Sequence, residues 1–327
     1  MLTRRDALVA AGVLAAGLAA SVRARAEALK KQARIIVGFP AGGGTDTIAR
    51  ILAERLRGTY ASAVLVENKP GAAARIGVEY VKNAEPDGSV MLFTPDFPIV
   101  LYPASYRSLN YDPVKDFVAV APAARSMLTF NIGPAVPEGV KTLRDFVQWC
   151  RDNPGKATFA TTAAGGTPHF VGVMLANAAG VAITPVHYRG GAPALQDLLG
   201  GHVPASVNPT SESLPHAKSG TLRMLAVSGS RRSPFLADVP TMREQGYDVV
   251  VDSWLGVFVP ARTPPDVVQA LSGAIREAVK SAEMVDNLAK VGNEPTFQTP
   301  EEFAATVKAD IARWGPIVKA SGFVAED

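Results

Sequence analysis

Residues 35–46 read Ile-Ile-Val-Gly-Phe-Pro-Ala-Gly-Gly-Gly-Thr-Asp, so an apolar run leads directly into a glycine-rich loop. Apolar residues at helical spacing follow the loop, namely Ile48, Ile51, Leu52 and Leu56. Glycines leave the backbone N–H groups of such a loop unobstructed, and the N-terminus of the following helix attracts negative charge. The stretch therefore predicts an α/β unit whose loop could bind an anion.

A second stretch has the same organisation. The strand candidate Ala157–Thr161 runs into Ala164-Gly165-Gly166-Thr167-Pro168-His169, and apolar residues at helical spacing follow. Neither loop has the ending of a P-loop or the glycine spacing of a dinucleotide fold, so nucleotide chemistry is not supported. Because ligands of open α/β sheets bind beyond the carboxyl ends of the strands, two such loops could face each other across a cleft. Helix capping without a ligand, to which Thr45 and Asp46 are suited, stays open.

Other apolar runs alternate with helical patterns, which favours an α/β protein with parallel strands. The remaining strand candidates are Val64–Glu67, Val90–Thr94, Met127–Ile132, Met224–Ser228 and Trp254–Val259. Thr299 and Glu302 have the spacing of a capping box and predict the start of a C-terminal helix. Cys150 shares a helical face with the apolar residues of segment 143–150, which predicts a buried thiol rather than a nucleophile.

The composition limits the class of protein. The 327 residues are 47% hydrophobic and include a single cysteine, which excludes a disulfide-stapled domain and a disordered chain. At this length we expect two domains of about 150 residues each. Residues 1–26 have the pattern of a cleavable signal peptide, because Arg4 and Arg5 precede the uncharged run Ala7–Ala20 and the cleavage motif Ala24-Arg25-Ala26. They predict export to the periplasm by the Sec or the twin-arginine route.

Removal of this segment changes the charge of the protein. The whole chain has 33 basic and 30 acidic residues, and the segment contains four arginines and one aspartate. The mature chain of 301 residues therefore has 29 basic and 29 acidic groups. A chain without net charge has no general attraction to nucleic acid or to a membrane surface. We therefore expect a small ligand and no nucleic-acid partner.

Seven segments of the chain form a recognisable series. They are Val37–Asp46, Val66–Ala72, Pro86–Gly88, Tyr188–Gly191, Leu198–Gly201, Val239–Tyr247 and Trp254–Pro260. In content and order the series resembles the Bug-type substrate-binding proteins of tripartite tricarboxylate transport systems. The resemblance implies a two-lobed α/β periplasmic-binding-protein fold of type 2, in which each lobe is a mostly parallel sheet flanked by helices. Two crossing segments form the hinge, and the lobes are residues 27–127 plus 250–327 and residues 128–249.

The resemblance also implies which residues hold a ligand carboxylate, partly through ordered waters. They are Phe39, Ala41, Gly43 and Asp46 on one side, with Gly42 and Thr45 of the same loop, and Gly165, Gly166, Thr167 and His169 on the other. Relatives often have serine where this chain has Gly166. Thr167, the Gly166 N–H group or a water must then replace the serine hydroxyl.

Further residues are candidates because of their own chemistry. Arg189 has the geometry to clamp a second carboxylate, with a solvated loop arginine as the alternative. Asn208 could line the cleft or belong to a turn, which the Asn-Pro pair favours. Asp96 follows a strand end, where it could meet a ligand amine or an arginine. His169 could contact the ligand or support its loop.

The sequence contains no constellation for catalysis or metal binding. Gly229-Ser230 lacks the flanking spacing of a serine-hydrolase elbow, and the four histidines lack metal-ligand spacing. We expect a monomeric, non-enzymatic receptor without cofactor or metal. It would capture a small carboxylate between the lobes and deliver it to a tripartite tricarboxylate-type membrane permease. An orphan carboxylate sensor that presents its ligand to a signalling partner, or a secreted hydrolase, is the alternative.

Overall fold

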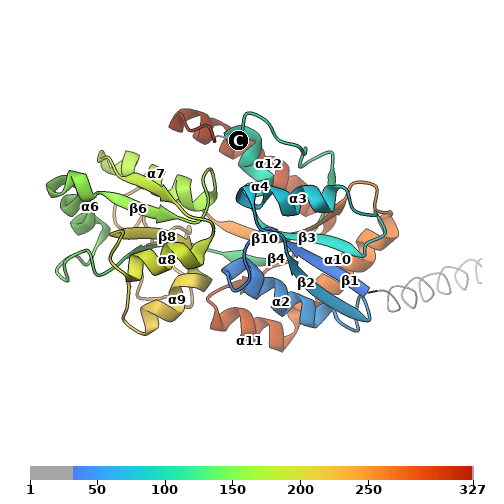
Figure 1. Cartoon of the computed structure of the whole chain (residues 1–327). Helices are drawn as coiled ribbons and strands as arrows, with labels where there is room; N and C mark the ends of the chain where they lie inside the picture. The colour runs from blue at the N-terminus through green and yellow to red at the C-terminus, as the bar shows by residue number, and fades with distance from the viewer. Residues whose placement is uncertain (1–31, 326–327) are drawn as a thin grey trace, which may run out of the picture.

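The computed structural model describes residues 32–325, and the predicted signal peptide at residues 1–26 lies outside them. The described residues form two β-sheets with helices packed against them, and the two sheets lie side by side in Figure 1. None of the described helices combines the length and the apolar character needed to cross a membrane.

The first sheet has six strands in the order β11-β4-β10-β3-β1-β2. These strands are β1 (Gln32–Val37), β2 (Ala63–Asn68), β3 (Val90–Pro95), β4 (Phe117–Ser126), β10 (Ser253–Pro260) and β11 (Glu294–Pro295). The helices of this part are α2 (Gly44–Leu56), η1 (Ala72–Ala74), α3 (Arg75–Lys82), α4 (Phe97–Val100), α5 (Tyr102–Ser105), α10 (Pro265–Lys280), α11 (Ala282–Lys290) and α12 (Pro300–Ser321).

The second sheet has five strands in the order β7-β6-β8-β5-β9. These strands are β5 (Leu128–Ile132), β6 (Thr158–Thr161), β7 (Thr184–His187), β8 (Ala205–Pro209) and β9 (Arg223–Val227). The helices of this part are α6 (Leu143–Asp152), η2 (Pro154–Lys156), α7 (Thr167–Ala179), α8 (Gly191–Leu199) and α9 (Thr210–Lys218).

The first sheet is buried on both faces. Ile35 and Val37 of β1 point into a core shared with α2 and α10. Ile36 points into the core on the opposite face, which includes Trp314 of α12. Successive side chains of a strand alternate between the two faces of a sheet. The uninterrupted apolar run of β1 therefore reflects a strand covered by helices on both sides.

The expected α/β class with parallel strands is confirmed, and each sheet also contains antiparallel pairs. β1 pairs in parallel with β2 and β3, and β6 pairs in parallel with β7 and β8. In contrast, β10 and β5 run antiparallel to both of their neighbours. Each is the first strand after the chain arrives from the other sheet. Each of these two strands therefore starts at the side of its sheet that faces the other sheet, and it runs away from that other sheet.

The chain passes between the sheets at two places. Met127 alone separates β4 from β5, and residues 228–252 connect β9 with β10. The two crossings are adjacent in space, because Ser126 at the end of β4 pairs with Ser253 at the start of β10. The lobe boundaries at 127/128 and 249/250 fall at these crossings and stay predictions.

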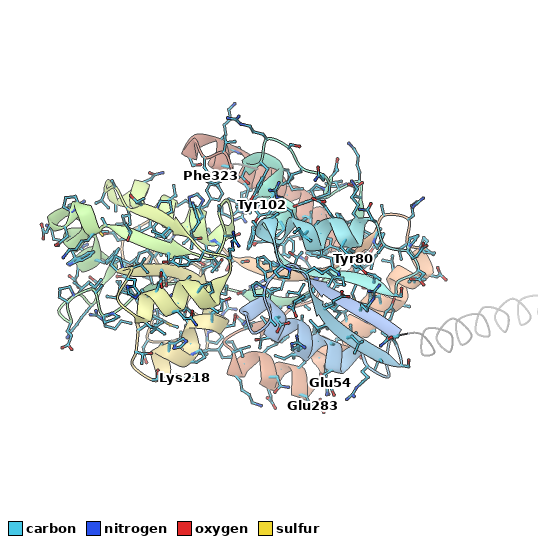
Figure 2. All side chains as sticks on the ribbon, in the orientation of Figure 1. Glu54, Tyr80, Tyr102, Lys218, Glu283 and Phe323 are labelled. Carbon is cyan, nitrogen blue, oxygen red and sulfur yellow. The ribbon has the colours of Figure 1, made fainter. Side chains whose placement is uncertain are left out.

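The C-terminal segment makes a further contact between the two parts of the molecule. α12 packs against β4, α4 and α5 of the first part. Beyond its end, Phe323 packs edge-on against His169 of α7, with ring centroids 4.6 Å apart. Figure 2 shows Phe323 at the boundary between the two parts. The end of the chain thus contacts the second part of the molecule, although the helix that precedes it packs on the first part.

Two local predictions are confirmed and one is wrong. Thr299 and Glu302 form the capping box at the start of α12. Cys150 is buried, and burial raises the pKa of its thiol to about 12, as a structural rather than a reactive thiol requires. The helix cap at the first loop differs, because Gly43 is the N-cap residue of α2 and Thr45 lies inside the first turn.

Candidate functional site

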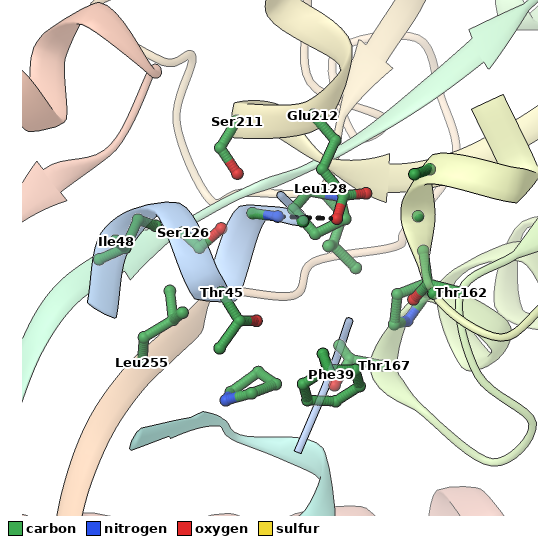
Figure 3. A pocket seen from close by; sticks show the side chains of 18 of the residues that line it. Phe39, Thr45, Ile48, Ser126, Leu128, Thr162, Thr167, Ser211, Glu212 and Leu255 are labelled. Atoms are coloured by element: carbon green, nitrogen blue, oxygen red, sulfur yellow. Dashed lines mark hydrogen bonds between the residues drawn. The ribbon is translucent and has the colours of Figure 1, made fainter. Parts of the chain in front are cut away.

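A pocket lies between the two sheets, where loops leave the carboxyl ends of β1, β3, β6, β7 and β8. The empty volume of the pocket is about 740 Å³, which includes solvent space at its open mouth. Most of the pocket wall is apolar. Figure 3 shows Phe39, Thr45, Thr167 and Glu212 around this space. The position agrees with the general rule that ligands of α/β sheets bind beyond the carboxyl ends of strands.

The pocket contains about half of the predicted site residues. Those that line it are Phe39, Ala41, Gly43, Thr45, Asp96, Thr167 and Arg189. Those outside its lining are Gly42, Asp46, Gly165, Gly166, His169 and Asn208. Several of the second group hold the lining in place through the bonds described below.

Asp46 is occupied by the protein itself. Its carboxylate accepts hydrogen bonds from the Gly42 N–H group, the Arg50 guanidinium and the Asn68 amide, each at 2.9 Å. Burial would raise the pKa of this carboxyl, but the bonds from Arg50, Gly42 and Asn68 outweigh burial and hold the pKa below its ordinary value of 3.8. Asp46 therefore fixes the first glycine loop on α2 from behind the pocket.

Replacing Asp46 with Ala is expected to lower the free energy of unfolding by about 2 kcal/mol at pH 7, because three donors lose a buried, charged acceptor. A lowered pKa stabilises the protein above pH 3.8, and this stabilisation is lost as pH falls through the pKa of the folded state. The difference between the two proteins should therefore shrink in acid. Urea unfolding at pH 7 and pH 3 measures it. Equal stabilities at pH 7 would refute the role of the carboxylate.

His169 supports the second glycine loop. Its Nδ1 atom accepts a hydrogen bond of 3.2 Å from the Gly165 N–H group, and Gly165 has a φ of +70°, which favours glycine. Burial, together with neighbouring His187, lowers the pKa of His169 to about 4. The imidazole is then neutral near pH 7, as an accepting Nδ1 requires. The geometry matches the loop-supporting alternative for this residue.

Gly166 lies where the two parts of the molecule come close together. It is the N-cap residue of α7, and a Cβ atom there would lie 3.3 Å from the ring of Phe97 in the first part. A serine side chain would have to displace this ring slightly. The glycine therefore allows α7 and α4 to approach each other.

Two hydrogen bonds join the two parts across the pocket. Thr167 Oγ1 donates to Asp96 Oδ1 at 2.9 Å, and the Gly44 N–H group donates to Glu212 Oε1 at 3.1 Å, the bond that is dashed in Figure 3. Asp96 is 1% exposed. Burial, with a smaller contribution from Asp310, raises the pKa of Asp96 to about 7 even though Thr167 donates to it.

Glu212 is the main lining residue that the sequence reasoning missed. It lies in the first turn of α9, directly after β8, and its Oε2 atom accepts a hydrogen bond of 3.0 Å from Asn208 Nδ2. Asn208 thus acts through Glu212 rather than through the pocket. Burial raises the pKa of the Glu212 carboxyl. The signal for Glu212 in the sequence was its position directly after a strand that ends at the pocket.

Arg189 supplies the positive charge of the pocket. Its side chain is exposed at the loop between β7 and α8 and lines the pocket. Within residues 32–325 it has no hydrogen bond or ion pair to another side chain. Its guanidinium can therefore bind an anion without first breaking a bond to the protein.

The chain is similar to known proteins over most of its length. Residues 48–323 match the tripartite tricarboxylate transporter family receptor, TctC. Protein BugT of Bordetella pertussis is 32% identical over 323 residues, which are 98% of each chain. A protein of Cupriavidus necator, described as UPF0065 protein in gbd 5'region, is 31% identical over 327 residues, again 98% of each chain.

Solved structures agree with this similarity. The periplasmic binding protein BugD superposes with a TM-score of 0.84 at 30% identity, covering 90% of this chain and 99% of BugD. Rpa4515 of R. palustris with adipate has a TM-score of 0.85 at 30% identity, covering 90% and 98% of the two chains. MatC of Rhodopseudomonas palustris with bound malate has a TM-score of 0.81 at 26% identity, covering 88% and 98%.

These superpositions confirm the two-lobed periplasmic-binding-protein fold that the sequence predicts. The two sheets joined by two adjacent crossings are its lobes, and the pocket lies between them. Because the family match and the similarity to BugT each extend over most of the chain, this protein belongs to the tripartite tricarboxylate transporter receptor family.

Proposed function

We propose that this protein is a periplasmic receptor that binds a small solute through a carboxylate in the pocket between the lobes. It then delivers the solute to the permease of a tripartite tricarboxylate system. The observation that carries the proposal is that loops of both lobes meet at one pocket that also contains Arg189. Two relatives of known structure, which were solved with adipate and with malate, support a carboxylate as the ligand class.

The chemistry of the pocket suits a carboxylate at its mouth. Thr45 and Thr167 stand in the first turns of α2 and α7, where backbone N–H groups and the helix dipole favour negative charge. Arg189 adds a guanidinium that can bind a carboxylate with two parallel hydrogen bonds. We assign Phe39, Ala41 and Gly43 to the wall around this group.

Ligand binding would favour the closed arrangement of the lobes. We take the lobes as residues 27–127 plus 250–327 and residues 128–249, with the hinge at the two crossings. A ligand that contacts Thr45 and Thr167 together makes both contacts only when the lobes are close, so it shifts the population toward closure. The permease would then recognise lobe surfaces that closure brings into register.

A thermal-shift screen with carboxylates and their matched amides tests the ligand class. At 100 times its dissociation constant, a ligand should stabilise the folded protein by about 2.7 kcal/mol, which is a readable shift. The expected result is stabilisation by at least one carboxylate and none by its amide, since the amide lacks the charge that Arg189 attracts. Replacing Arg189 with Gln should weaken the response. An amide that stabilises as well as its acid would overturn the proposal.

A further inference from the structure

The pocket contains three charged side chains, and two of them are acidic. Asp96 and Glu212 line it together with Arg189. Asp96 already accepts the Thr167 hydroxyl, whereas Glu212 is only partly covered and its carboxylate faces the pocket space in Figure 3. A ligand in this pocket must therefore accommodate the carboxylate of Glu212.

The Glu212 carboxylate is fixed in position by neutral groups. Its two oxygens accept from the Gly44 N–H group at 3.1 Å and from the Asn208 amide at 3.0 Å. Among residues 32–325, its partners are these two groups, and no arginine, lysine or histidine forms an ion pair with it. The protein thus orients this charge but supplies no cation to neutralise it.

The surrounding backbone makes room for this arrangement. A Cβ atom on Gly191 at the start of α8 would overlap the Glu212 carboxylate. A Cβ atom on Gly44 would meet the Ser211 hydroxyl and would lie 3.3 Å from the Glu212 side chain. Both glycines therefore leave space for the carboxylate between the lobes.

A neighbouring hydroxyl has an unused hydrogen-bonding capacity. The Ser211 Oγ atom is buried, lines the pocket and has no hydrogen-bond partner within residues 32–325. An unpartnered buried polar atom is costly unless a ligand or a water satisfies it. Ser211 and Glu212 together present hydrogen-bond acceptors to the same space.

We infer that Glu212 is a specificity-determining residue that selects solutes with one carboxylate and one ammonium group over dicarboxylates. This inference rests on the proposed function, because Arg189 and the glycine loops hold the carboxylate. The ammonium pairs with the Glu212 carboxylate and donates to Ser211. A second carboxylate at that position is repelled by Glu212 between the largely apolar walls of the pocket.

Isothermal titration with ligand pairs matched in their methylene chains tests the selection. Glutarate pairs with 4-aminobutanoate, and adipate pairs with 5-aminopentanoate, so that each pair differs only in a distal carboxylate or ammonium. We expect the amino acid of at least one pair to bind the purified protein about tenfold more tightly than its dicarboxylate, or better. Glu212→Gln keeps the shape of the side chain and should reduce this ratio to about one. Glu138→Gln, which removes an exposed charge from the same lobe, should leave the ratio unchanged.

The outcomes separate the inference from the function on which it rests. Preference of the unmodified protein for the dicarboxylates overturns the inference but leaves the proposed function intact. A binding ratio that is unchanged in a folded Glu212→Gln protein has the same consequence. Absence of binding by every carboxylate in the pairs and in the thermal screen overturns both. If Glu212→Gln does not fold, the ratio in the unmodified protein decides alone.

Discussion

Replacing Asp96 with Asn is expected to stabilise the protein progressively as pH rises from 5 to 8. Burial raises the pKa of Asp96 to about 7, from an ordinary value of 3.8. A raised pKa means that the protonated carboxyl stabilises the folded protein below pH 3.8. This stabilisation is lost as pH rises through about 7, at about 1.4 kcal/mol per pH unit. Asparagine does not titrate, so the advantage of the variant should grow by about 3 kcal/mol between pH 5 and pH 8.

Urea unfolding of the ligand-free proteins at pH 5 and pH 8 measures this difference. Asparagine keeps an oxygen that can accept from Thr167, so the contact across the pocket is retained. Asp238→Asn, at an exposed position, serves as the control for loss of one acidic group. A difference between Asp96→Asn and the unmodified protein that does not change with pH would show that folding does not raise the pKa of Asp96.

Replacing Gly172 with Ala is expected to destabilise the protein by about 2 to 3 kcal/mol. Gly172 lies on the buried face of α7, and a Cβ atom there would overlap the ring of Phe159 on β6. Phe159 is fully buried in the core, where close packing resists a shift of its ring. α7 would have to shift away from the sheet and would carry Thr167 with it, so ligand binding should weaken as well. Chemical denaturation together with titration of the ligand found in the screen measures both effects.

A second glycine provides the matched control. Gly273 lies in α10, and a Cβ atom there meets no other atom within 4 Å. Alanine is favoured over glycine in a helix by about 1 kcal/mol. Gly273→Ala should therefore stabilise the protein, and the two substitutions should have opposite signs. If Gly172→Ala also stabilises, the close packing of α7 on β6 does not limit this position.

The sequence was most informative where a strand has an uninterrupted apolar run and ends in a glycine loop. β1 and β6 both end in such a loop; the loop after β1 lines the pocket, whereas the loop after β6 reaches it through Thr162 and Thr167 and not through its glycines. β4, β7 and β8 escaped notice for different reasons. β4 contains Pro122, which lies at an irregularity in its pairing with β10. β7 is a half-exposed edge strand with a proline, and β8 is largely built from small residues.

The binding site was harder to predict because its partners are distant in sequence. Glu212 meets the N–H group of Gly44, a residue 168 positions earlier, and no local pattern indicates that contact. The family resemblance assigned Asp46 to the ligand. The folded chain instead surrounds its carboxylate with three donors. The resemblance predicted that Asp46 matters, but not which groups its carboxylate binds.

The contact of Phe323 with α7 has a thermodynamic consequence for the binding reaction. Any separation of the lobes that breaks this contact exposes aromatic surface of Phe323 and His169 to water. Burial of apolar surface lowers the heat capacity, whichever molecule supplies that surface. A lobe closure that forms this contact would therefore contribute a negative heat-capacity change of its own, even for a wholly polar solute. The temperature dependence of the binding enthalpy would then report on the end of the chain as well as on the ligand.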